Sequence, residues 1–402
     1  MLGSLFGINI IINRGFGTAE LGEFTFAYTI AQIVIMGVGG AFSPLLRREI
    51  ILQNKEDANK YLISVLQLRV YIITFCCVLC SLLFIFLHSS QVKLNTIVLI
   101  MLLIKGLDSL TETFYTTFQS LKRYNTFALI KSSNAIINIV AVLLIALLKL
   151  PVLALYFSLA MVALFYLICN LFYVSKIFKI KKYIKLNWHY SAEKKSIVME
   201  GWPLILNSIF FQISSRVSVV FVYSISGKIV TGVFSAAIMM ITVFTAFANS
   251  LGVVFFPRLA QIYTQNKLAL FKYLQKTAFV IGTLGTVLCG IFIATIYWQL
   301  KIVGHMPPYA YRMFFIAGLS IPFAILSAVF GNVFVILRKQ ILGMYLAAII
   351  LIINCVLYYC LPQIDSILGA SFAYLISNVL IVIVFTIFII KVYTELKKGV
   401  LN

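Results

Sequence analysis

The feature that most constrains this chain is a series of long apolar runs separated by short polar loops. Apolar residues make up 62% of its 402 positions, and charged residues make up only 11%. A transmembrane helix needs about twenty apolar residues, whereas a strand of a membrane barrel alternates in polarity over about ten. Because most runs here reach about twenty residues or more, the sequence predicts an all-α, polytopic membrane helical bundle.

Twelve such runs can be placed along the chain, and the first is too short to cross the hydrocarbon. Its length predicts that the first span is truncated and that the protein begins upstream of Met1. The runs lie near residues 1–13, 24–46, 65–87, 94–119, 127–148, 152–174, 197–225, 230–256, 277–300, 309–336, 341–361 and 367–390.

One long polar interval divides these runs into two groups of six. It carries seven lysines and a single acid, Glu193. Such a segment cannot lie in hydrocarbon, and its charge favours the anionic cytoplasmic face of a membrane. We therefore expect an N-terminal half at residues 1–174, a basic cytoplasmic hinge at 175–196, and a C-terminal half with a cytoplasmic tail at 197–402.

The other basic residues support this topology, because loops with many Lys and Arg residues alternate along the chain with loops that have few. One set of loops holds 22 Lys and Arg residues and the other only five. Because cytoplasmic loops carry the excess of Lys and Arg, both termini are expected in the cytoplasm. The net charge of +21 then needs no nucleic-acid partner, since the basic residues lie in short loops. The poorer set consists of Arg14, Lys93, Lys149, Lys228 and Lys301.

An internal repeat relates the two halves. Two glycines, a phenylalanine and an alanine at the entry to the second span recur 210 residues later; they are Gly17, Gly22, Phe24 and Ala27, matched by Gly227, Gly232, Phe234 and Ala237. A second register, offset by 216, matches Ile136, Ile137 and Asn138 to Ile352, Ile353 and Asn354. Six spans is an even number, so the halves are expected to insert the same way, related by a pseudo-twofold axis along the membrane normal.

Charged residues gather on the fourth span. Lys105, Asp108, Glu112, Thr116 and Gln119 recur at spacings of three or four, which places them on one helical face. A charged residue at the centre of a span costs roughly 2.5–3.5 kcal/mol on insertion scales. This stripe must therefore face other helices or water.

Two interpretations of the stripe remain open. Lys105 and Asp108 can neutralise each other while Glu112 bonds to a neighbouring helix. Alternatively, the stripe lines a central cavity in which Lys105 meets an anionic substrate and Asp108 or Glu112 takes up a coupling proton or cation. The equivalent positions of the second half are Ile321, Ala324 and Ala328, so the charges are concentrated in the first half.

Five further cations lie within spans or at their ends. Arg216 lies inside the seventh span, where it can snorkel outward or bind phosphate oxygens with its planar fork of donors. Arg14 and Arg312 lie at span ends, as interfacial anchors or as ligands of the same anionic substrate. Arg69 and Lys131 lie near cytoplasmic span ends and are expected to snorkel to the headgroups.

Two prolines interrupt predicted spans. Pro203 and Pro322 free backbone groups in the seventh and tenth spans, and they are either hinges for alternating access or kinks without a functional role. The three histidines lie in loops without ligand spacing, and the cysteines lie in or beside apolar runs. We therefore predict no catalytic residue, metal site or cofactor.

Three stretches of the chain resemble a known family. They are Arg14 to Phe24, Gly232 to Ala237 leading to Phe256-Pro257-Arg258, and Leu361-Pro362 followed by Leu368-Gly369-Ala370. They are similar to the Wzx-type polysaccharide flippases, in the polysaccharide transporter branch of the multidrug, oligosaccharidyl-lipid and polysaccharide (MOP) exporter superfamily. The likeness covers essentially the whole chain.

The resemblance implies a fold like that of the multidrug and toxin extrusion (MATE) exporters and a location in the bacterial inner membrane. It also implies a substrate, a polyprenyl-diphosphate-linked oligosaccharide such as an O-antigen repeat unit, which alternating access moves from the cytoplasmic to the outer leaflet. Lys105, Arg216, Arg14 and Arg312 are then candidate ligands of the diphosphate and sugars. A polysaccharide polymerase and a chain-length regulator are the implied protein partners.

Three other functions fit parts of the sequence less well. A cation-coupled multidrug exporter of the same superfamily would use Asp108 and Glu112 to attract a cationic drug, but the excess of cations argues against it. A membrane glycosyltransferase or ligase usually needs a large outer loop or a soluble domain, and the predicted outer loops are short. A scaffold for the assembly machinery would leave the charged stripe of the fourth span unexplained.

Overall fold

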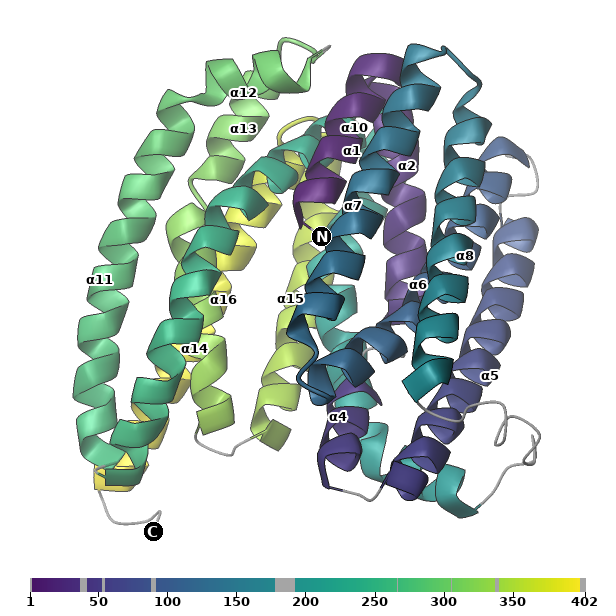
Figure 1. The fold of residues 1–402 in the computed structure, drawn as a ribbon. Helices are drawn as coiled ribbons and strands as arrows, with labels where there is room; N and C mark the ends of the chain where they lie inside the picture. The colour runs from purple at the N-terminus through teal and green to yellow at the C-terminus, as the bar shows by residue number, and fades with distance from the viewer. Residues whose placement is uncertain are drawn as a thin grey trace. The chain divides into compact units, whose positions relative to one another are not determined.

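The computed structural model describes most of the chain as helix (Figure 1). The described residues are 2–36, 42–52, 55–87, 92–177, 192–265, 267–304, 306–336 and 340–397. Most of the predicted basic hinge and the histidines at positions 88, 189 and 305 lie outside them. No strand occurs in the described ranges, so the predicted all-α fold is confirmed.

The helices follow the apolar runs of the sequence. In chain order they are α1 Leu2–Phe16, α2 Thr18–Ala31, the π-helix η1 Gln32–Met36, α4 Phe42–Leu52, α5 Lys55–Leu87, α6 Val92–Ser120, α7 Tyr124–Leu147, α8 Val152–Ile177, α10 Ala192–Gln265, α11 Lys267–Ala294, α12 Ile296–Val303, α13 Ala310–Gly318, α14 Ile321–Ile336, α15 Gln340–Ile364 and α16 Gly369–Lys397.

Within the described residues, eight helices are long and apolar enough to cross a membrane, and nine if α13 and α14 form one bent span. Large apolar side chains are exposed on these helices, including Leu129 at 71% and Phe279 at 73%. In water such a surface would be unfavourable, whereas lipid tails solvate it at no cost. The protein is therefore a multi-pass membrane protein, while the count of twelve spans stays a prediction.

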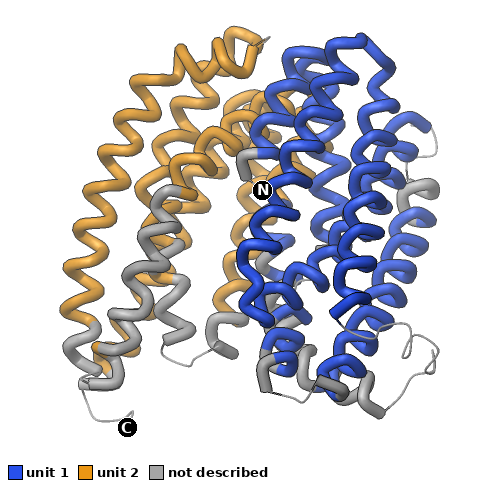
Figure 2. Tube along the Cα trace, in the orientation of Figure 1, with its two compact units in different colours: residues 1–216 blue, residues 217–402 orange. Residues whose placement is uncertain are grey.

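The chain forms two compact units, residues 1–216 and 217–402 (Figure 2). In the first unit α6 is the central helix, since it packs against α2, α4, α5, α7 and α8. In the second unit α16 has this role and packs against α11, α13, α14 and α15. The first unit includes the beginning of α10, up to Arg216. The division into six-span halves around a hinge stays a prediction.

The predicted repeat is visible in the backbone. Gly17, between α1 and α2, has φ 95° and ψ 168°, and Gly227, inside α10, has φ 80° and ψ 177°. Only glycine adopts this region readily, because a Cβ atom would clash with the backbone. The matched glycines therefore make the same break before the second helix of each unit.

Side-chain packing repeats as well. Phe24 of α2 lies 6.1 Å from Tyr156 of α8, measured between ring centroids. Its counterpart Phe234 of α10 lies 6.4 Å from Tyr374 of α16. Both phenylalanines are buried. In each unit, the helix that follows the glycine break is thus joined to the last long helix of that unit by an aromatic pair.

Pro322 is the second residue of α14, which meets α13 at 41°. A proline is tolerated in the first turn of a helix because its missing N–H has no intrahelical partner there. Gly285 of α11 packs on this bend, since a Cβ at position 285 would lie 2.9 Å from the Cα atom of Pro322. Pro203 lies within α10, and its side chain is outside the described part of the structure. A hinge role for either proline stays a prediction.

The two glycine breaks can be tested by substitution. Gly17→Ala and Gly227→Ala should each destabilise the protein by about 1–3 kcal/mol, because alanine is strained at these torsion angles. Thermal unfolding in detergent micelles measures the effect. Gly290→Ala is the matched control, since position 290 is in a helix and has open space around its Cβ. Unchanged melting temperatures for both break variants would contradict the assignment.

Candidate functional site

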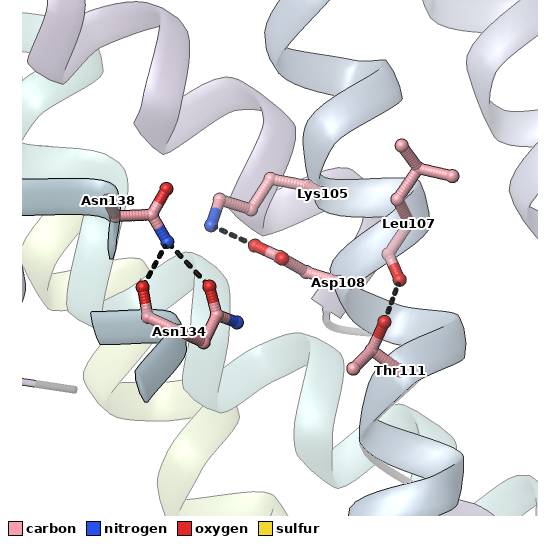
Figure 3. Close-up of polar contacts among 6 residues, drawn as sticks. All are labelled: Lys105, Leu107, Asp108, Thr111, Asn134 and Asn138. Atoms are coloured by element: carbon pink, nitrogen blue, oxygen red, sulfur yellow. Dashed lines mark hydrogen bonds and ion pairs between the residues drawn. The ribbon is translucent and has the colours of Figure 1, made fainter. Parts of the chain in front are cut away.

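The charged stripe predicted on the fourth span lies on α6, the central helix of the first unit. Lys105 is only 8% exposed, and its Nζ atom lies 2.7 Å from Oδ2 of Asp108, one turn along the helix (Figure 3). The same ammonium lies 4.5 Å from the ring centroid of Tyr28 on α2. An ion pair at i,i+3 and a cation–π contact thus stabilise a charge that would be costly in lipid.

Arg216 joins this pair from another helix. It lies half-buried on α10, within electrostatic range of Lys105. Two of the cations predicted to bind an anionic substrate therefore lie within electrostatic range of each other. Asp108 pairs directly with one of them, Lys105.

Glu112 lies one turn beyond Asp108 on the same helix. Its carboxylate makes no hydrogen bond or ion pair with any residue that the structure describes. It is within electrostatic range of Arg47, Arg69 and Lys131, which come from α4, α5 and α7. Three cations from three helices thus act on this carboxylate through electrostatics, and none of the described residues bonds to it directly.

The expectation that Arg69 snorkels to the headgroups is wrong. Its side chain is 1% exposed, with Nη1 donating to the Ser109 carbonyl at 2.6 Å and Nη2 donating to Ser43 Oγ at 2.9 Å. Arg69 points into the unit because these acceptors on α6 and α4 satisfy its guanidinium fork. It therefore joins three helices, α4, α5 and α6, around the charged stripe.

Lys131 of α7 lies against aromatic rings, and its expected snorkelling stays a prediction. Its Nζ atom lies 5.0 Å from the ring centroid of Phe127 and 5.7 Å from that of Tyr115 on α6. The rest of the predicted stripe is engaged as well, since Thr116 donates to the Glu112 carbonyl and Gln119 accepts from Arg47 at 2.7 Å. Spacing on the sequence could have indicated that Lys131 belongs to a polar face of α7, because polar residues follow it three and seven positions later.

The remaining two predicted cations are both exposed. Arg14 is exposed in the last turn of α1. Arg312 is exposed in the first turn of α13, which belongs to the second unit. Their role as substrate ligands stays a prediction. A different lysine, Lys93, links α6 to α2 through ion pairs of 2.6 Å to Glu20 and 3.0 Å to Glu23.

The architecture defines the class of the protein as a multi-pass, all-helical membrane protein. Similar solved structures include the lipid II flippase MurJ in an inward closed conformation, with a TM-score of 0.71, 16% identity, and 98% of this chain and 87% of that one covered. Another is an inward-facing multidrug resistance MATE family transporter of the MOP superfamily, with a TM-score of 0.73, 14% identity, and 98% and 95% covered. At these identities the likeness concerns the fold alone.

The family follows from the sequence comparison. Residues 4–263 match the family described as polysaccharide biosynthesis protein, and the chain belongs to that family. It is also 26% identical over 283 residues to the capsular polysaccharide biosynthesis protein CapF of Staphylococcus aureus, covering 69% of this chain and 67% of CapF. The resemblance predicted from the sequence is confirmed at the level of family and fold.

The buried guanidinium of Arg69 can be tested for its structural role. Arg69→Met should lower the stability of the protein in detergent by about 2 kcal/mol or more, because hydrogen bonds from a charged group contribute about 1.5–3 kcal/mol each. Arg69→Lys should be intermediate, since one ammonium lacks the geometry of the fork. Arg47→Met, which removes an exposed arginine with one such bond, is the control. Equal melting temperatures for Arg69→Met and Arg47→Met would contradict this role.

Proposed function

We propose that this protein is a flippase that moves a polyprenyl-diphosphate-linked oligosaccharide from the cytoplasmic to the outer leaflet of the bacterial inner membrane. The family and the likeness to CapF support a role in polysaccharide biosynthesis. A solved structure of similar fold is described as a lipid II flippase. Such a substrate combines an anionic diphosphate, polar sugars and a long apolar tail.

The observation that carries the proposal is the excess of cations around α6. Among the described residues, two carboxylates, Asp108 and Glu112, are within electrostatic range of one or more of five cations, which are Lys105, Arg216, Arg69, Arg47 and Lys131. An excess of positive charge is unfavourable at membrane depth even where single cations have partners, and a bound anion would offset that cost. A diphosphate supplies the missing negative charge.

The mechanism that we infer starts when Lys105 exchanges one anionic partner for another. Lys105 leaves Asp108 and binds the diphosphate together with Arg216, whose fork of donors suits phosphate oxygens. Asp108 and Glu112, then less neutralised by Lys105, take up the coupling proton or cation. The polyprenyl tail stays in lipid along the exposed apolar surface. The unit then opens to the other side by alternating access, with both termini in the cytoplasm.

A multidrug exporter is the second candidate. Glu112 favours it, because its carboxylate has no direct partner among the described residues and could attract a cationic drug. The larger number of cations around it opposes such binding. Drug sensitivity of a strain lacking the chain distinguishes the two functions, since a flippase of lipid-linked sugars predicts unchanged minimum inhibitory concentrations.

The lipid-linked pool tests the function directly. In cells lacking this chain, the completed oligosaccharide on its polyprenyl diphosphate should accumulate on the cytoplasmic face, because synthesis continues while translocation stops. Extraction of the lipid pool, with a sidedness assay on oriented vesicles, measures this. Re-expression of the intact chain is the control. A normal pool together with normal surface polysaccharide would reject the flippase.

The charges of the site can be tested in the same cells. Lys105→Ala and Arg216→Ala should each reduce surface polysaccharide about tenfold or more, since loss of a charge-assisted bond to phosphate costs about 1.5–3 kcal/mol. Lys60→Ala, which removes an exposed lysine paired with Asp57, should be neutral. Protein levels in the membrane must be equal. Normal polysaccharide in both site variants would rule out the charge argument.

A further inference from the structure

Helix α7 carries a second polar face that the sequence analysis did not identify. Lys131, Asn134 and Asn138 recur at spacings of three and four, so they lie on one side of the helix. The exposed apolar residues Leu129, at 71%, and Ile136, at 60%, lie about half a turn away from them. The polar face therefore points away from the lipid-exposed surface, toward α6.

The two amides on this face bond to each other. Asn138 Nδ2 donates to the Asn134 carbonyl at 3.0 Å and to Asn134 Oδ1 at 2.7 Å. Asn134 also lies beside the hydroxyl of Tyr115 on α6. Figure 3 shows both amides on the side of α7 that points toward the Lys105–Asp108 pair. Both asparagines are only partly buried, and Oδ1 of Asn138 accepts no hydrogen bond from any described residue.

The repeat shows what an asparagine at this position does when its role is structural. Asn354, the counterpart of Asn138, is 4% exposed and accepts a hydrogen bond from Ser377 on the next helix, α16. Such bonds between helices are the usual use of buried polar residues in membranes. Two offsets relate the units here: 216 residues separate Asn138 from Asn354, and 218 residues separate Tyr156 from Tyr374. At these offsets the positions equivalent to Ser377 are Met161 and Leu159, whose side chains have no hydroxyl. Asn138 thus has the amide of Asn354, but the compared positions of the first unit hold no hydroxyl that could donate to it.

We propose that Asn134 and Asn138 bind hydroxyl groups of the sugar part of the substrate and determine which glycan is accepted. A carboxamide offers two donors and one acceptor, which match the hydroxyls of a pyranose ring. Sugar recognition needs a few fixed polar groups of this kind. Because the amides lie on the side of α7 that points toward the Lys105–Asp108 pair (Figure 3), a diphosphate bound to Lys105 would place the first sugars on the α7 side of the site. The inference rests on the proposed function and adds specificity to it.

Binding to two separate probes tests the inference on the purified full chain. One probe is the repeat-unit oligosaccharide cut from the host cell's own surface polysaccharide, which exists whether or not this chain transports it. The other is inorganic diphosphate. Asn134→Leu, Asn138→Leu and Asn138→Gln are compared with wild type by calorimetry. Ser133→Ala is the matched control, because its hydroxyl bonds only within α7, to the Ile130 carbonyl.

We expect each leucine variant to bind the oligosaccharide about tenfold more weakly, as for the loss of one or two hydrogen bonds. Asn138→Gln should retain part of the affinity, and Ser133→Ala all of it. Every α7 variant should bind inorganic diphosphate like wild type. Failure of wild type to bind the sugar, wild-type sugar affinity in both leucine variants, or equal loss of both probes would overturn the inference. Failure of the proposed function would instead appear as diphosphate affinity that is unchanged by Lys105→Ala and Arg216→Ala.

Discussion

The structure depends on one constraint, which is that an ionisable side chain cannot face lipid at low cost. The chain concentrates such residues on α6, and this helix therefore occupies the centre of its unit, enclosed by five others. Neighbouring helices then contribute groups that compensate the charges of α6. Tyr28 covers the Lys105 ammonium, and the Arg69 guanidinium bonds to the Ser109 carbonyl. The position of α6 and the chemistry of the site thus have the same physical cause.

The two units share a backbone plan but differ in what they enclose. Matched glycines make the same break, and matched phenylalanines pack on an equivalent tyrosine. The counterpart of the charged α6 segment is instead the apolar bend between α13 and α14. There, a Cβ at Gly318 would lie 2.6 Å from the Phe292 ring, so the helices pack closely. The first unit therefore encloses charged groups, and the equivalent segment of the second unit is closely packed and apolar.

The sequence predicted features that depend on local pattern and missed those that depend on tertiary partners. Apolar runs gave the helices, and the spacing of Lys105, Asp108 and Glu112 gave their common face. Arg69 was misplaced because snorkelling and inward burial are both possible near a span end, and only the acceptors on other helices decide between them. The polar face of α7 was predictable, since its three- and four-residue spacing is the same signal that identified the stripe of α6.

The ion pair of Lys105 and Asp108 is well suited to a transporter for two reasons. Both charges have a partner when no substrate is bound, and the Lys105 ammonium can still exchange that partner for a substrate anion. A cation buried without any partner would destabilise the empty protein, whereas one held by several carboxylates would not release them. Here a single carboxylate, on the same helix and partly exposed, holds the ammonium at 2.7 Å. In the mechanism that we propose, an incoming diphosphate replaces this bond with stronger ones shared with Arg216, and the freed carboxylate becomes available to a proton or cation. The same ion pair would then stabilise the resting state and couple substrate binding to the binding of a second ligand.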